Sequence, residues 1–145
     1  MNTIINQLRT PDECLEFAEK HTVLAQEARL RAIELRAAAH DNKDDVEKEL
    51  WKAIYAYEEV LSKKNNRRTL ASRTRQMIAR HGILKAAERA VNRKIEAMGY
   101  RLLVDLGLKD LTFEAIIVRY PESFDPKIVK LCVERLVELT QSLKN

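Results

Sequence analysis

Glycine and proline are scarce in this chain of 145 residues, which contains three of each. A sheet-rich fold needs more of both residues at its turns, so their scarcity favours helices joined by short loops. No run of about 18 apolar residues occurs, so the sequence predicts no transmembrane helix. The first residues also lack the basic and apolar pattern of a signal peptide. We therefore expect an all-α protein in the cytoplasm, without a membrane partner.

Groups that could carry chemistry are also scarce. The two cysteines, Cys14 and Cys132, form no CxxC pair, and we expect buried thiols, with a disulfide as the less favoured alternative. The three histidines stand at no metal-ligand spacing. No glycine-rich loop is present to hold a nucleotide phosphate. The sequence therefore predicts a protein that is not an enzyme and that holds no metal and no cofactor.

Acidic residues are almost missing from the middle of the chain. Between Lys63 and Arg101 the sequence holds twelve lysines and arginines but only two acids, Glu88 and Glu96. The part before this segment holds eight basic and thirteen acidic residues, and the part after it is nearly neutral. Such a separation of charge along the chain gives information on the partners that the protein can attract, but not on its fold.

The acidic part, residues 1–66, predicts two long helices. Thr10 and Pro11 are typical of a helix start, and no residue breaks the helix before about His40. At about 1.5 Å per residue this helix would be a rod of about 45 Å. The polar stretch 41–45 offers several caps for a second helix, and so short a connection favours a long antiparallel helical hairpin. The apolar stripe of the second helix is Val46, Leu50, Ala53, Ile54, Tyr57 and Leu61.

Residues 67–145 are expected to form a compact basic module of several helices with a C-terminal helix. Gly82 and Gly107 are each followed by an apolar residue, which is typical of the Schellman motif at a helix end. Residues 113–120 are rich in β-branched and aromatic side chains, so a strand stays an alternative to the helix that we favour. Asp125 and the proline after it predict the start of a last helix, which is apolar on more than one face.

The basic segment is the candidate functional surface. Its cations far outnumber its acids, so they either pack against the acidic hairpin or face solvent and bind phosphate. Arginine outnumbers lysine, which favours phosphate because the guanidinium fork matches its geometry. The candidate nucleic-acid-binding residues are Arg67, Arg68, Arg73, Arg75, Arg80, Lys85, Arg89 and Arg93.

The helix–glycine–helix pattern at residues 72–94 invites comparison with the helix-turn-helix of DNA-binding proteins. If Gly82 is the turn glycine, Glu88 falls where the second helix should present an apolar residue to the first. A helix pair joined at a glycine is common outside DNA-binding proteins. The sequence therefore does not predict a helix-turn-helix that reads DNA.

Three stretches of the sequence resemble a family of small uncharacterised bacterial proteins. They are Ser72–Gly82, Ala90–Arg93 and the run GYRLLVDLGLKDLTFEAIIVRYPESF, and the resemblance covers roughly residues 50–125. The family has no assigned activity, so the resemblance implies no functional residue. It implies only that the middle and C-terminal parts form one recurrent module.

These observations favour a non-enzymatic nucleic-acid-binding protein that grips the phosphate backbone through its basic helices, residues 67–94. The alternative is a protein–protein adaptor or inhibitor that uses the helical hairpin and the C-terminal helix, with the basic face against an acidic protein surface. The long alanine-lined hairpin and the apolar last helix also predict a homodimer through the N-terminal hairpin or the C-terminal helix.

Overall fold

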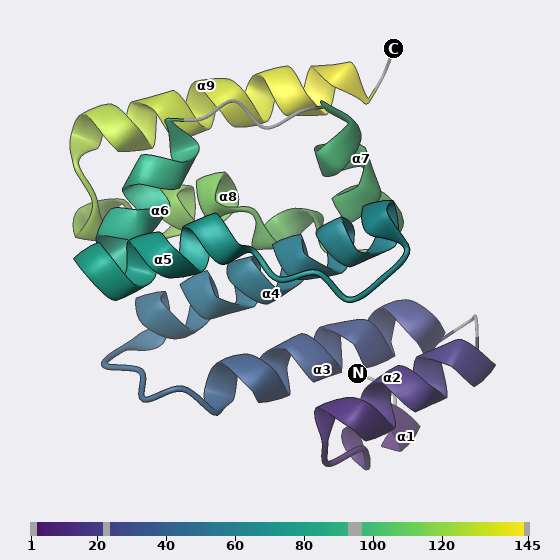
Figure 1. Ribbon diagram of the computed structural model, residues 1–145. Helices are drawn as coiled ribbons and strands as arrows, with labels where there is room; N and C mark the ends of the chain where they lie inside the picture. The colour runs from purple at the N-terminus through teal and green to yellow at the C-terminus, as the bar shows by residue number, and fades with distance from the viewer. Residues whose placement is uncertain (1–2, 22–23, 93–96, 144–145) are drawn as a thin grey trace.

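The computed structural model describes residues 3–21, 24–92 and 97–143, and every regular element in these ranges is helical (Figure 1). The prediction of an all-α protein is therefore confirmed. The α-helices are α1 (Thr3–Asn6), α2 (Pro11–Lys20), α3 (Ala25–Ala38), α4 (Asp45–Asn65), α5 (Ser72–His81), α6 (Ile83–Val91), α7 (Ala97–Asp105), α8 (Phe113–Arg119) and α9 (Pro126–Ser142). Two short 3₁₀ helices are η2 (Lys109–Leu111) and η3 (Pro121–Ser123). None of the helices in the described ranges has the length and apolar character needed to cross a bilayer.

The first predicted helix is two helices, so the expectation of one unbroken rod is wrong. α2 ends where the His21 N–H donates to the Phe17 carbonyl at 3.0 Å, and α3 then runs back beside α2 (Figure 1). The fold-back buries Cys14 of α2 and the small side chains Ala28 and Ala32 of α3. A straight rod would leave part of this surface in water, so burial of the apolar face explains the reversal.

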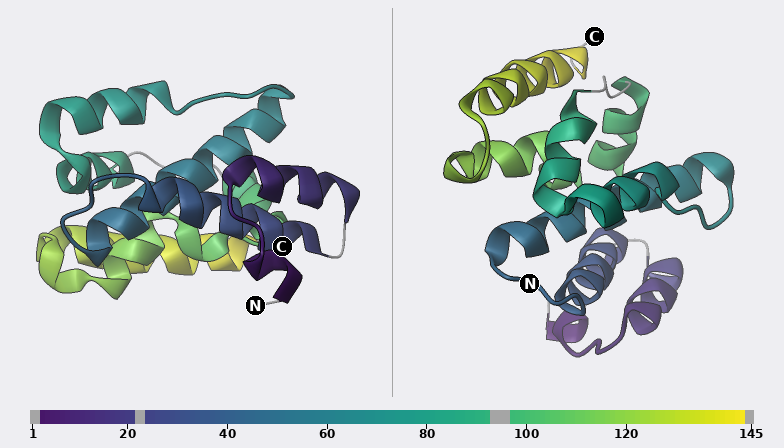
Figure 2. Two further views of the ribbon diagram at one scale, coloured as in Figure 1. Left: turned by 90° about the horizontal axis from the view of Figure 1, so that it is seen from below. Right: turned by 60° about the vertical axis from the view of Figure 1, so that its left-hand side comes forward.

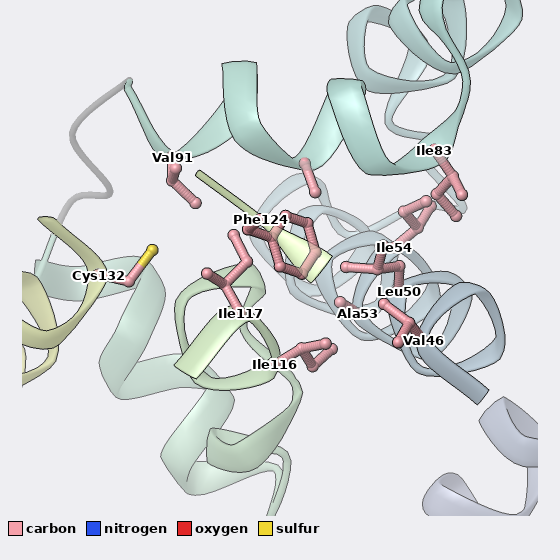
Figure 3. Close-up of a cluster of buried hydrophobic side chains, with 11 residues drawn as sticks. Val46, Leu50, Ala53, Ile54, Ile83, Val91, Ile116, Ile117, Phe124 and Cys132 are labelled. Atoms are coloured by element: carbon pink, nitrogen blue, oxygen red, sulfur yellow. The ribbon is translucent and has the colours of Figure 1, made fainter. Parts of the chain in front are cut away.

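α4 is the central helix, because it supplies side chains to both apolar clusters. Figure 3 shows the larger cluster, in which side chains of α4, α6 and α8 surround Phe124. Its buried members are Val46, Leu50, Ala53, Ile54, Ile83, Ala87, Val91, Ile116, Ile117, Phe124 and Cys132. The second cluster combines Ile33 of α3 and Val60 of α4 with leucines from α7 onward. The predicted α4 stripe is thus buried at its first four positions, whereas Tyr57 is 42% exposed.

The helices stack in layers on the two sides of α4. α1–α3 lie on one side of it, and α9 lies at the opposite end of the molecule, beyond α6–α8 (Figures 1 and 2). α9 packs against α8, α6 and α7. This arrangement leaves α5 and the loop that precedes it at one edge of the molecule (Figure 2, left).

Side-chain caps begin several of the helices, and those of α2, α4 and α9 lie where the sequence predicts a helix start. The acceptors are Thr10 Oγ1 for α2 (3.2 Å from Glu13 N), Asp44 Oδ1 for α4 (3.0 Å from Glu47 N), Thr112 Oγ1 for α8 (3.0 Å from Ala115 N) and Asp125 Oδ1 for α9 (2.8 Å from Lys127 N). Each satisfies a backbone N–H that has no partner inside its helix. α8 is therefore a capped helix, and the strand alternative for residues 113–120 is wrong.

The two predicted Schellman glycines differ. Gly107 has φ 76°, and the motif's two hydrogen bonds run from its N–H to Val104 at 3.0 Å and from Leu108 N–H to Leu103 at 2.8 Å. Gly82 has φ 81° and ψ 165° and ends α5 and begins α6 at the same residue. The Schellman prediction holds at Gly107 only, because α6 begins directly after Gly82.

Candidate nucleic-acid interface

The loop between α4 and α5 presents the first two candidate arginines, Arg67 and Arg68, and both are exposed. The loop leaves α4 at Asn66, whose φ of 52° lies in the left-handed region. Thr69 N–H donates to Ser62 Oγ at 2.9 Å, and the Ser62 hydroxyl donates to the Thr69 carbonyl at 3.3 Å. The two arginines are therefore carried by a loop that is tied back to α4 at its far end.

Arg75 is only partly exposed and is bound to a buried carboxylate. Its Nε donates to Glu58 Oε2 at 2.7 Å and its Nη2 to Glu58 Oε1 at 2.9 Å. Glu58 is 6% exposed, and its Oε2 also accepts the Ala71 N–H at 2.8 Å. The hydrogen bonds that Arg75 donates to Glu58 raise the pKa of the Arg75 guanidinium above its ordinary value.

This pairing corrects the placement of Arg75 among the phosphate-binding candidates. The sequence grouped it with solvent-facing cations, but its guanidinium neutralises an acid that α4 buries. A buried carboxylate needs such a partner, because desolvation without one is costly. Arg75 is therefore a structural residue that joins α5 to α4.

Aromatic rings complete the environment of Arg75. Its guanidinium carbon lies 5.5 Å from the ring centroid of Tyr55 and 5.9 Å from that of Trp51, within cation–π range. His40 stacks on Trp51 with 3.7 Å between centroids, and its Nε2 lies 2.7 Å from the Tyr55 hydroxyl oxygen. Burial, with Arg75 as the second cause, lowers the pKa of His40 below its ordinary value. The cluster fixes the ends of α3 and α5 against α4.

α5 and α6 carry the remaining described candidates toward solvent. On α5, Arg73 and Arg80 are exposed and stand about two helical turns apart. On α6, Lys85 and Arg89 are exposed and stand about one turn apart. Arg93, the remaining candidate, lies outside the described residues.

Packing of the opposite helix faces explains why these cations point outward. α5 buries Thr74, and α6 buries Ile83, Ala86, Ala87 and Val91. The two helices pack against each other, and α6 also packs against α4 and α8. An amphipathic helix that buries its apolar face has only its polar face left for water.

The described acid of the basic segment is turned away from the outer side. The Glu88 side chain is 16% exposed, and its Oε2 accepts the N–H of Asp125 at the start of α9 at 3.3 Å. Lys85 Nζ lies 3.5 Å from Glu88 Oε1, but the Lys85 side chain is 73% exposed. An ion pair this exposed is weak, so Lys85 stays available to a partner.

Both arrangements that the sequence allows for the cations therefore occur: some pair with acids of the N-terminal helices, and others face solvent. Glu58 binds Arg75, whereas Glu59 lies near Arg29 and Arg36 of α3, at 4.0 and 3.6 Å. The other five arginine candidates that the structure describes form no salt bridge with a described residue. The exposed set Arg67, Arg68, Arg73, Arg80, Lys85 and Arg89 is called the basic surface below.

An open groove of about 700 Å³ lies beside the basic surface, among α2, α3, α4 and the α4–α5 loop. Its charged lining residues are Asp12, Arg29, Arg36, Glu58, Glu59, Arg68 and Arg75. Glu58 and Glu59 already pair with three of these arginines. The groove therefore joins the basic surface mainly through Arg68.

Other chemistry finds little support within the described ranges. No group of three His, Cys, Asp or Glu residues there could hold a metal ion. Cys14 and Cys132 are both buried and free, so the disulfide alternative is not formed. Glu114 is an unusual group that the sequence did not lead us to expect, because this ionisable side chain is only 1% exposed. The signal was present, because Glu114 is the only charged residue between Phe113 and Val118.

Comparison of the chain with protein-family models, with curated proteins and with solved structures finds no match. The resemblance to a family of small uncharacterised bacterial proteins stays a prediction. The function is therefore inferred below from the geometry of this chain alone.

Proposed function

We propose that this protein binds nucleic acid by gripping the phosphate backbone with the basic surface. The observation that carries the proposal is the outward placement of six cations on three consecutive elements, the α4–α5 loop, α5 and α6. The acid of this segment that the structure describes, Glu88, accepts the N–H of Asp125 and forms an ion pair with Lys85, whose side chain is highly exposed. A partner that approaches this side meets positive charge with little local compensation.

The chemistry of the basic surface suits phosphate better than bases. Five of its six members are arginines, whose planar guanidinium binds phosphate oxygens through two parallel hydrogen bonds. No Phe, Tyr or Trp occurs between Lys63 and Tyr100, so this segment offers no ring on which a base could stack. We therefore expect duplex binding with little sequence preference.

Salt dependence of duplex affinity tests the proposal quantitatively. If each of the six cations neutralises one phosphate, the slope of log K against log salt is about −5. Replacement of Arg73, Arg80, Lys85 and Arg89 by alanine should flatten the slope by about 3 to 4 units. The measurement is fluorescence anisotropy of a labelled duplex at several salt concentrations.

A matched control separates a specific surface from total charge. The control removes four exposed lysines elsewhere, in the variant Lys43→Ala/Lys109→Ala/Lys127→Ala/Lys130→Ala. This variant has the same net charge as the first and should keep a slope close to that of the natural chain. Equal flattening by both variants, or no binding at low salt, would contradict the proposal.

A protein partner is the second candidate function. Val133 and Val137 stand one turn apart on α9 and are 46% and 52% exposed, although both are large and apolar. Such a pair favours a protein contact on α9, while the basic surface would meet an acidic partner. Failure of duplex binding, together with co-purification of an acidic protein that the substitution Val133→Glu/Val137→Glu releases, would support this function instead.

A further inference from the structure

A pocket of about 330 Å³ lies under α5, between that helix and α4, α7 and α8. Its size falls in the range of small-molecule sites, which is about 300–1,000 Å³. The wall is mainly apolar and includes Ala53, Val60, Leu103, Leu111 and Phe113. No member of the basic surface lines this pocket, so the pocket is separate from the proposed nucleic-acid interface.

One ionisable side chain of the wall is fully buried. Glu114, the second residue of α8, lines the pocket and is 1% exposed. Its Oε2 atom has no hydrogen-bond partner among the described residues. Buried carboxyl oxygens are normally paired, because an unpaired one loses its hydration without compensation. The pocket therefore contains a buried carboxyl oxygen to which no group in the described part of the chain donates a hydrogen bond.

The surroundings of Glu114 determine the pKa of its carboxyl group. Burial raises its pKa to about 7, and a hydrogen bond from the backbone N–H of Glu114 and the charge of Arg135 of α9 oppose this effect. Burial, with Glu114 as the second cause, raises the pKa of Cys132 to about 12, so this thiol of α9 is neutral. Lys64 of α4 is exposed where it lines the pocket, and the lining residue Thr74 of α5 has no charge. Near pH 7 Glu114 can thus gain or lose a proton when its surroundings change.

We propose that this pocket binds a small organic amine, whose protonated nitrogen donates to Glu114 while its apolar body fills the space under α5. The charge of such a ligand complements the buried carboxylate, and its body matches the apolar wall. A neutral ligand could satisfy the oxygen atom but would add no positive charge to favour the ionised form of Glu114.

Binding would be coupled to the loss of one proton. When the ammonium enters, the Glu114 carboxylic acid gives its proton to solvent and becomes the carboxylate of the ion pair. At pH 6, where the free carboxyl is mostly neutral, about one proton should be released for each amine bound, and at pH 8.5 about none. Calorimetric titration in two buffers of different ionisation enthalpy measures this number on the natural chain.

Three probes of similar shape test the ligand class. They are 2-phenylethylamine, its neutral analogue 2-phenylethanol and the anion 3-phenylpropionate, each titrated at pH 8 with amide chemical shifts as the readout. We expect the amine to bind at least tenfold more tightly than the alcohol, and the anion to bind most weakly. Equal binding of amine and alcohol, or no shifts in the pocket at millimolar amine, would overturn the proposal.

Two variants assign the effect to the pocket. Glu114→Gln keeps the shape but not the charge, so it should remove the preference for the amine and the proton release while the alcohol binds as before. Ala90→Leu adds bulk at a partly buried lining residue and should weaken the binding of amine and alcohol alike. If Glu114→Gln does not fold, the number of protons that the natural chain releases per bound amine tests the proposal. A value near zero at pH 6 overturns it.

Discussion

Removal of the Arg75 side chain should destabilise the fold without weakening the basic surface. In Arg75→Ala, Glu58 keeps the Ala71 N–H but loses both guanidinium donors, at 2.7 and 2.9 Å. Breaking a fully buried ion pair costs about 3–5 kcal/mol. The Arg75 side chain is 32% exposed, so solvent screens part of the interaction, and we expect a loss of about 2–3 kcal/mol.

Chemical and thermal denaturation measure this loss. The denaturation midpoint should fall at an unchanged m-value, and Tm should fall by about 4–12 °C for a chain of this size. A double-mutant cycle with Glu58→Gln isolates the pair, and we expect a coupling energy of about 1–2 kcal/mol.

Arg73→Ala is the matched control, because Arg73 lies on the same helix but faces solvent. We expect its stability to stay within about 0.5 kcal/mol of that of the natural chain. In the duplex assay the pattern reverses, since Arg73→Ala should reduce the salt slope by about one unit and Arg75→Ala should leave it unchanged. A stability loss below about 0.5 kcal/mol for Arg75→Ala, or a coupling energy near zero, would refute the structural role of the pair.

Two further predictions follow from the buried acid and from α9. Because burial raises the pKa of Glu114 from 4.5 to about 7, the folded state binds its proton more tightly than the unfolded state. The free energy of unfolding should therefore fall by about 3 kcal/mol as the pH rises from 4.5 to 7, and Glu114→Gln should abolish that part of the fall; flat urea-denaturation midpoints across this range would contradict it. The exposed apolar residues Val133 and Val137 predict that the chain self-associates, and the substitution Val133→Glu/Val137→Glu should weaken this association. Sedimentation measures it, and a natural chain that sediments only as a monomer at tens of micromolar would count against the prediction.

Local signals of the sequence were sufficient for the helix boundaries that they mark. Thr10, Asp44, Thr112 and Asp125 each accept a backbone N–H within the next three residues, so their effect depends on nothing distant. An uninterrupted helical pattern in the sequence did not predict where the first helix ends. The reversal between α2 and α3 depends on the burial of Cys14 against a later helix, which no local pattern records.

The sequence predicted that the candidate surface is rich in arginine and lysine, but it wrongly included Arg75. Arg73 and Arg75 lie two residues apart on one helix, yet one is exposed and the other binds Glu58, a residue 17 positions earlier. Side chains two apart on a helix point in different directions, and only the position of α5 relative to α4 decides which of them meets the buried acid.

The sequence by itself determined that the chain is helical, where several helices begin, and that positive charge concentrates between Lys63 and Arg101. These properties depend on residue types and on hydrogen bonds between near neighbours. Only the tertiary structure decided which cations stay in water and that Glu114 is buried beside a pocket. Burial and ion pairing join residues that are far apart in the chain, and their free energies depend on the local loss of water, which exists only once the helices have packed.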